Sequence, residues 1–185
     1  MSTFSIGALN QLADALEKTG FTTDDVTKLK QFGNLKGIKD IITGRAGIAY
    51  PEHLIDCSTV PFIPEGWTCE THQESGLYKF NPAKISLYQS KKQIKGTIEG
   101  NKLRRELAGK SVLNANVLDY LLAHPDLIPE EWKGKRIYFW GTIYRSSRGD
   151  LVVRCLRWGG SQWDWSCGWL DGGFSSGSFA VLASS

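Results

Sequence analysis

The sequence predicts an α+β fold, in which a helical N-terminal element precedes a mixed domain with short helices packed on a C-terminal antiparallel sheet. Two patterns indicate this class. Apolar residues recur at helical spacing in the first 50 residues and in much of residues 82–132, and from residue 135 onward they alternate with a period near two. The chain has 185 residues, 41% of them hydrophobic, which permits one packed domain and a small accessory element.

Residues 1–49 are predicted to form the small helical element. The second of its three short helices begins at Thr22–Asp25, which supplies capping oxygens and negative charge at the N-terminal end. A third stretch runs from Leu35 to Ile42 and ends at Gly44. Such short helices bury little apolar surface, so we expect them to dock on the rest of the chain or on a partner. The first of the three helices is expected to end near Gly20. Its apolar face consists of Ile6, Leu9, Leu12, Ala13 and Leu16.

Residues 51–185 are predicted to form the α+β domain. Residues 47–83 are rich in proline and glycine, which favours an irregular segment with short strands near 67–71 and 77–80. Residues 82–132 are expected to be mainly helical. One helix ends at Gly109, and the next is capped by Asn114 or Asn116 and stopped before Pro125. A single helical turn is expected around Pro129–Trp132.

The end of the chain is predicted to form an antiparallel meander of about four strands. Short polar and glycine-rich connections separate its alternating segments, and such connections favour antiparallel pairing over crossovers. We expect the strands at residues 136–145, 150–158, 162–170 and 178–182.

Aromatic residues are concentrated on these predicted strands. A row of Trp residues shares one face of the third strand, and the first strand has large residues on both faces, although a half-exposed sheet has one polar face. The rings either form the contact between sheet and helices or leave an open platform that stacks bases, sugars or a peptide beside Arg145, Arg154 and Arg157. The platform residues are Tyr138, Trp140, Tyr144, Trp163, Trp165 and Trp169.

Basic residues are concentrated in residues 84–110, which carry eight Lys or Arg against two Asp or Glu, although the whole chain has a net charge of only +3. This excess is typical either of a solvated helical face or of a surface for phosphate backbones. The predicted nucleic-acid-binding residues are Lys84, Lys91, Lys92, Lys95, Lys102, Arg104, Arg105 and Lys110.

Two pairs of histidine and cysteine residues suggest the hypothesis of a zinc site. His53-x3-Cys57 and Cys69-x2-His72 have ligand-like spacing, although their order is not a diagnostic zinc pattern. The same residues allow Cys57 to act as a nucleophile with His53 or His72. No H-E-x-x-H or Walker motif is present, and the G-x-S-x-G spacing at Gly173–Gly177 falls in a predicted glycine- and serine-rich loop instead of the strand-to-helix turn of a nucleophile elbow. The sequence therefore favours no catalytic residue, no cofactor other than a possible zinc ion, and a protein that is not an enzyme.

Three segments resemble a family of small uncharacterised bacterial proteins, many of them known from environmental genomes. These segments are Val112–Pro125 (VLNANVLDYLLAHP), Ile128–Lys135 (IPEEWKGK) and Phe139–Arg145 (FWGTIYR). The resemblance covers residues 53 to about 170. It implies a bacterial or phage-associated, intracellular, soluble protein, and it implies no activity, ligand or catalytic residue.

The sequence thus favours a non-catalytic binding protein that associates with nucleic acid through the basic segment and an aromatic surface. The alternative is a protein-interaction adaptor that docks a partner through its N-terminal helices, and the third possibility is a cysteine-dependent enzyme. No apolar run reaches the roughly 18–20 residues of a membrane helix, and no secretory signal is visible. Four cysteines are too few for a disulfide scaffold, which favours the cytoplasm.

Overall fold

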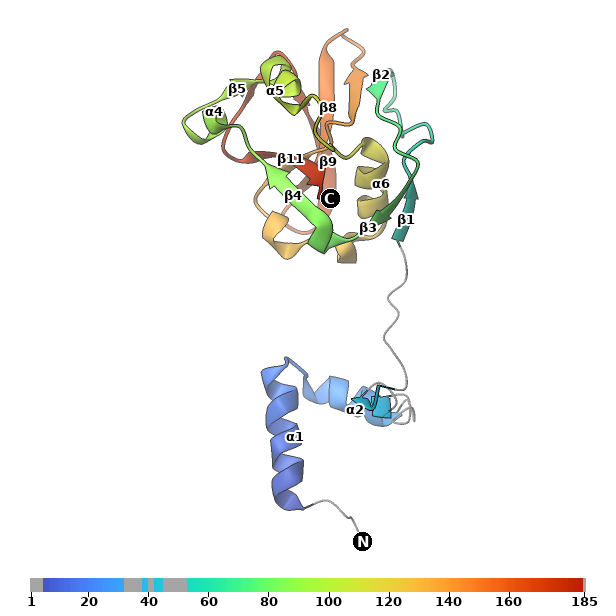
Figure 1. The fold of residues 1–185 in the computed structure, drawn as a ribbon, viewed down its shortest axis with the longest axis vertical. Coiled ribbons are helices and arrows are strands. Elements are labelled where there is room, and N and C mark those ends of the chain that lie inside the picture. Colours follow the sequence, from blue (N-terminus) through green and yellow to red (C-terminus); the bar gives the residue numbers. More distant parts are fainter. Residues whose placement is uncertain (1–4, 32–37, 40–41, 45–52, 185) are drawn as a thin grey trace. The chain divides into compact units, whose positions relative to one another are not determined.

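The computed structural model describes residues 5–31, 38–39, 42–44 and 53–184 (Figure 1). The chain divides into two compact units, Met1–Pro51 and Glu52–Ser185. The boundary predicted near residue 50 lies outside the described residues. Much of the predicted third helix lies outside them too, although Ile38, Lys39 and Ile42 are helical.

The first unit contains the two predicted helices, α1 (Ile6–Lys18) and α2 (Thr23–Gln31). Ser5 caps α1, since its Oγ accepts a hydrogen bond from the Ala8 backbone N–H at 3.2 Å. Gly20 follows α1 with a φ of +85°, a conformation that favours glycine. Before α2, the Thr22 N–H and hydroxyl both donate to Asp25, which holds the pKa of that exposed carboxyl below its ordinary value. The predicted end of the first helix near Gly20 and the predicted start of the second at Thr22–Asp25 are confirmed.

The second unit is built around one main sheet, in which seven strands lie among the described residues (Figure 1). The hydrogen-bonded order is β2-β7-β8-β6-β11-β4, and β9 pairs with β8. Two smaller sheets join β1 to β3 and β5 to β10. The strand bounds are β1 His53–Asp56, β2 Thr68–His72, β3 Leu77–Phe80, β4 Ile85–Tyr88, β5 Ile98–Glu99, β6 Arg136–Tyr138, β7 Thr142–Arg145, β8 Leu151–Trp158, β9 Trp163–Trp169, β10 Gly173–Phe174 and β11 Ser178–Ala183.

The α+β class is confirmed, and most strand pairs are antiparallel, but the sheet is not a simple meander. The predicted strand at 136–145 is divided into β6 and β7, with Phe139–Gly141 between them. The last strand, β11, pairs in parallel with β6 and antiparallel with β4. Strand β4 lies in the segment that was expected to be helical. The β7–β8–β9 part of the sheet is the meander that the sequence predicts.

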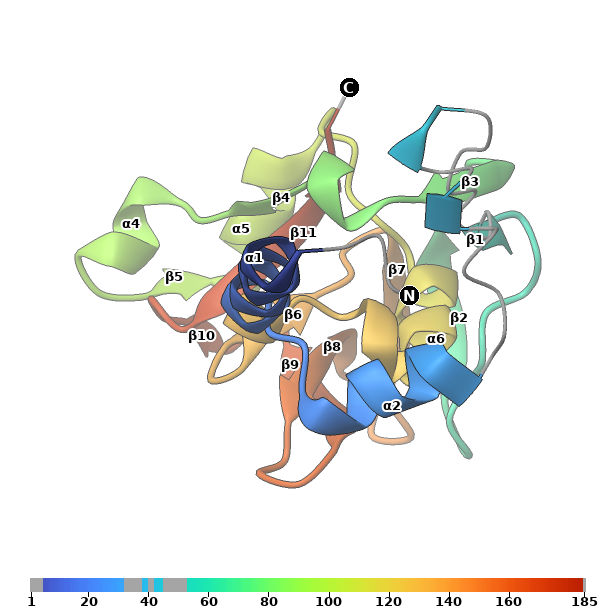
Figure 2. The same cartoon turned by 90° about the horizontal axis from the view of Figure 1, so that it is seen from below.

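Short helices cover both faces of this sheet. They are α4 (Lys91–Ile94), α5 (Gly100–Leu107), α6 (Ala115–Ala123) and the 3-10 turns η1 (Pro82–Lys84), η2 (Pro125–Leu127) and η3 (Glu130–Trp132). Leu156 of β8 packs in one cluster with Leu118 of α6, whereas its neighbour Cys155 packs in another with Leu103 of α5. Since successive strand residues point to opposite faces, α6 and α5 lie on opposite sides, as Figure 2 shows.

Asn114 begins α6, because its Oδ1 accepts from the Asn116 backbone N–H at 3.2 Å. Of the two caps that the sequence proposes for this helix, Asn114 is therefore the one used. In the part of the chain that the structure describes, no helix combines the length and the apolar character of a membrane span.

Candidate functional site

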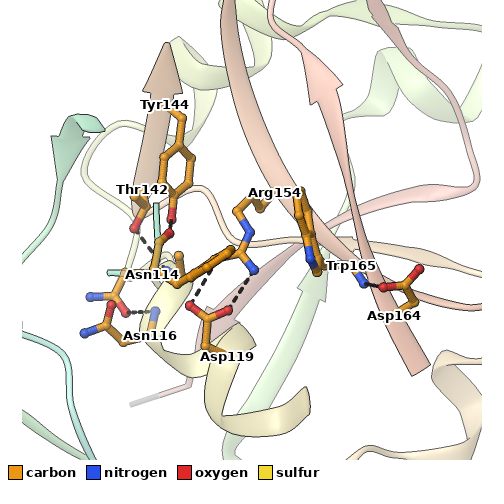
Figure 3. A network of polar contacts seen from close by, with 10 residues as sticks. Asn114, Asn116, Asp119, Thr142, Tyr144, Arg154, Asp164 and Trp165 are labelled. Atoms are coloured by element: carbon orange, nitrogen blue, oxygen red, sulfur yellow. Dashed lines mark hydrogen bonds and ion pairs between the residues drawn. The ribbon is translucent and has the colours of Figure 1, made fainter. Parts of the chain in front are cut away.

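A buried ion pair joins β8 to α6. The Arg154 guanidinium, only 1% exposed, donates to both carboxylate oxygens of Asp119 at 2.7 and 3.1 Å (Figure 3). It also lies over the Trp165 ring at 4.6 Å and the Phe62 ring at 5.1 Å. Burial works against the charge, but the hydrogen bonds and charge of Asp119 outweigh it and hold the arginine pKa above its ordinary value. No pattern in the sequence predicts this pair, because its two residues are 35 positions apart.

A groove of about 330 Å³ lies beside this pair. Its walls include Leu54, Val60 and Phe62, which are all exposed apolar residues. Its charged groups are the carboxylates of Asp56 and Asp119, and the Asp119 carboxylate is paired with Arg154. The groove thus offers apolar surface and negative charge, and it does not suit a phosphate backbone.

Three of the six predicted platform residues belong to the core. Tyr138, Trp140 and Tyr144 are 3%, 4% and 0% exposed. Tyr138 and Trp140 pack on Phe174, with ring centroids 4.9 and 5.2 Å apart. Both faces of this part of the sheet are covered, so an open platform that includes these rings is wrong.

The three Trp residues of β9 share one face, as their spacing predicts, but they have different surroundings. Trp165 is half-buried against Trp67, at a centroid distance of 6.2 Å, and against Arg154. Trp163 packs on Trp158 at 5.4 Å. Trp169 is 44% exposed. Of the three indoles of β9, Trp169 is therefore the one with the largest exposed fraction, and the one best able to stack on a base.

The four predicted zinc ligands do not assemble. His53 Nδ1 lies 3.0 Å from the Tyr120 hydroxyl. His72 Nδ1 lies 2.8 Å from Thr142 Oγ1, and its Nε2 lies 3.1 Å from the Cys57 carbonyl oxygen. Among residues 53–184 and the described parts of the first unit, no cluster of His, Cys, Asp or Glu has a metal-binding arrangement. The His72 hydrogen bonds therefore join β2, β7 and the Cys57 loop instead of holding an ion, and the predicted site at His53, Cys57, Cys69 and His72 is wrong.

Cys57 is poorly placed to act as a nucleophile. Its side chain is buried, and this burial raises the pKa of the thiol. His72 contacts the backbone oxygen of Cys57, so no hydrogen bond from the thiol to this imidazole activates it. The remaining cysteines, Cys69, Cys155 and Cys167, also have raised pKa values because of burial, to about 11 for Cys155.

We expect Cys57 to react with iodoacetamide at pH 8 at least about tenfold more slowly in the native protein than after unfolding, because the buried thiol stays protonated. Pulsed alkylation followed by peptide mass spectrometry measures this rate, with the half-buried Cys69 as an internal comparison. Preferential labelling of Cys57 in the folded protein at neutral pH would instead support the cysteine-enzyme hypothesis.

Seven of the eight predicted basic residues gather at one end of the second unit. Strand β5 lies between α4 and α5 there, in both views (Figures 1 and 2). Lys84 stands apart in η1, before β4. We call this end the basic surface, and its cations are Lys91, Lys92, Lys95, Lys102, Arg104, Arg105 and Lys110.

The two acidic residues of this segment leave several of the cations uncompensated. Lys92 pairs with Glu106 at 3.6 Å, which ties α4 to α5. Lys102 pairs with Glu99 at 3.2 Å and holds the pKa of that carboxyl below its ordinary value. Among the described residues, Lys91, Lys95 and Arg105 form no ion pair. The basic surface therefore keeps exposed positive charge.

The end of strand β9, which carries the exposed Trp169, is attached to the start of α5. Trp169 directly precedes Leu170, whose carbonyl oxygen accepts from the Asn101 backbone N–H at 2.8 Å. The Gly100 N–H donates to the Gly172 carbonyl oxygen at 3.0 Å. These two bonds attach the end of β9 to the start of α5. The Trp169 ring itself lies on the other face of the sheet, because its partner Val152 packs with Ala115 of α6, whereas the next residue, Leu170, packs with Leu103 of α5.

No protein-family model, no curated protein and no solved structure matches this chain. The family resemblance noted above stays a prediction, and the arguments for function come from the residues of the chain itself.

Proposed function

We propose that the protein is a non-catalytic binding protein that associates with single-stranded nucleic acid through the basic surface. The observation that carries this proposal is the gathering of seven cations around α4 and α5, with Glu99 and Glu106 as the acidic residues of the same segment. Such a local field attracts phosphate backbones, and each neutralised phosphate releases counterions.

Trp169 supports the choice of a single strand. A base stacked on an exposed indole contributes about 1–3 kcal/mol with little preference for sequence. The bases of a duplex are already stacked on one another, whereas a single strand can offer one to a ring. The end of β9 is hydrogen-bonded to the start of α5, so a strand that leaves the cations and passes around this end of the sheet can reach the ring on the α6 face.

We place the protein in the cytoplasm. All four cysteines are free, and free thiols persist in a reducing compartment.

Replacing Lys91, Lys95 and Arg105 by glutamine is expected to weaken binding of a labelled single-stranded oligonucleotide by more than about tenfold at low salt. These cations are exposed and form no ion pair among the described residues, so their loss leaves the fold intact. Fluorescence anisotropy with single-stranded RNA and DNA measures the change.

A matched control removes the same charge elsewhere in the second unit, by replacing Lys84, Lys135 and Arg148 with glutamine. The control is expected to keep its affinity within about threefold, because long-range attraction is screened over roughly 10 Å at 0.1 M salt. Equal losses in both triple variants would show that net charge alone governs binding, and would overturn the assignment to the basic surface.

The second candidate function is a protein-interaction adaptor, which the apolar face of α1 favours. Ile6, Leu9 and Leu12 of α1 are exposed, and no residue of the helix is buried. An amphipathic helix of this kind can lie in the groove of a protein partner. Leu9→Glu with Leu12→Glu in the full chain separates the two candidates, because it abolishes helix docking and leaves oligonucleotide binding unchanged.

A further inference from the structure

A small pocket opens between β2, α5 and the β6–β7 connection. Its volume is about 140 Å³, several times the ~30 Å³ that one water molecule occupies in the liquid. Leu107 and Val112 form its buried apolar part. Its polar side chains are Thr71, Gln73, Arg104 and Trp140.

Trp140 contributes an unused hydrogen-bond donor to this wall. The residue is 4% exposed, and its indole Nε1 has no hydrogen-bond partner among the residues that the structure describes. A buried N–H without an acceptor is unfavourable, and native proteins satisfy almost all such groups. An indole N–H only donates, so the group that completes this site must be an acceptor.

Arg104 supplies positive charge at the same pocket. Its Nη2 donates to Thr71 Oγ1 at 3.2 Å, and within the described parts of the chain its guanidinium forms no ion pair. Carboxylates near the lining residues in the sequence are engaged elsewhere. Glu70, next to Thr71, binds Arg145 at 3.0 Å, and Glu99 and Glu106, on either side of Arg104, bind Lys102 and Lys92. No acidic side chain lines the pocket.

We infer that this pocket binds a phosphate monoester, with Arg104 and the Trp140 N–H donating to its oxygens. A guanidinium and an N–H donor with no competing carboxylate select a polyoxygen anion. The volume holds one tetrahedral oxyanion but leaves no room for a nucleoside beside it. A group attached through one bond therefore fits, and a terminal phosphate is such a group. This inference rests on the proposed function, because it makes the pocket the place where the end of a bound strand is recognised.

Isothermal titration with inorganic phosphate at low ionic strength tests the pocket itself. We expect saturable binding to the full chain, and at least about a tenfold loss in Arg104→Gln, since charge-assisted hydrogen bonds are lost. Trp140→Phe removes the N–H together with part of the ring and is expected to weaken phosphate binding severalfold. Arg148→Gln is the matched control, because this exposed arginine lies outside the basic surface and does not line the pocket.

Arg104→Gln keeps the test conclusive even if Trp140→Phe fails to fold, because Arg104 is at the pocket mouth and only half-buried. The inference is overturned if phosphate does not bind the full chain. It is also overturned if Arg104→Gln and Arg148→Gln bind phosphate equally well.

Oligonucleotides of one sequence that carry a phosphate at the 5′ end, at the 3′ end or at neither end identify the source of the phosphate. We expect one terminal phosphate to tighten binding by about tenfold, and Arg104→Gln to abolish that difference. Binding of inorganic phosphate without oligonucleotide binding would keep the pocket and contradict the proposed function. Equal binding of all three oligonucleotides, with no binding of inorganic phosphate, would overturn the inference about the pocket and leave the proposed function standing.

Discussion

Asp119→Asn is expected to lower the free energy of unfolding by about 3 kcal/mol, because it leaves the Arg154 charge buried without compensation. The side chain of Arg154 is 1% exposed and that of Asp119 is 29% exposed. Because water still reaches Asp119, the expected loss lies at the lower end of the range for broken buried ion pairs. The aromatic rings around the guanidinium cannot replace a carboxylate, since a cation–π contact contributes roughly 0.5–2 kcal/mol. Chemical denaturation followed by tryptophan fluorescence measures the loss.

Asp164→Asn is the matched control for this variant. Asp164 pairs with Arg157 at 3.5 Å, and both side chains are about half exposed, so its loss is expected to cost less than about 1 kcal/mol. The double variant Arg154→Met with Asp119→Leu removes both charges and is expected to recover much of the stability. Equal small losses in the two single Asn variants would contradict the description of Arg154 and Asp119 as a buried, mutually dependent pair.

Gly100→Ala is expected to destabilise the second unit by about 3 kcal/mol, as overpacking of a close contact does. A Cβ at this position would lie 2.6 Å from Phe174 Cε2 and 2.7 Å from the Leu170 Cα. Both distances are shorter than real Cβ contacts, and the second atom is backbone, which cannot move aside cheaply. Because Gly100 is the first residue of α5, the substitution is also expected to shift the helix that carries Lys102 and Arg105.

Gly96→Ala provides the comparison, since nothing lies within 4 Å of a Cβ there. It is expected to change stability by less than about 1 kcal/mol. Thermal unfolding of both variants measures the difference. A Gly100→Ala protein as stable as Gly96→Ala would show that β9 and α5 are not packed as closely as described.

Local signals in the sequence predicted the helices with recognisable ends. Asn114 caps α6 with its own side chain, Thr22 donates to Asp25 at the start of α2, and Gly20 has the positive φ that a C-terminal cap requires. Period-two alternation also located β8 and β9 within a residue or two. These features depend on neighbours in the chain, so a single sequence reveals them.

Features that depend on distant residues were missed. Strand β4 is only four residues long, so the alternation of Ile85 and Leu87 is too short to predict a strand beside the nearby lysines. Its partner β11 is almost 100 residues further along the chain. The two-sided aromatic character of β6 and β7 suggested an open face, but α6 covers one side and α5 with Phe174 covers the other. The pocket beside Arg104 combines β2, α5 and Trp140, and no spacing rule links them.

The salt dependence of oligonucleotide binding tests the proposed function most directly. For the full chain and single-stranded RNA or DNA, log Kobs is expected to fall linearly with log[KCl] between about 50 and 200 mM, by about 0.7 for each phosphate contacted. Replacement of Lys91, Lys95 and Arg105 by glutamine is expected to reduce the steepness of this slope by about 2. No measurable binding at the lowest salt, or a slope that the three substitutions leave unchanged, would contradict the account.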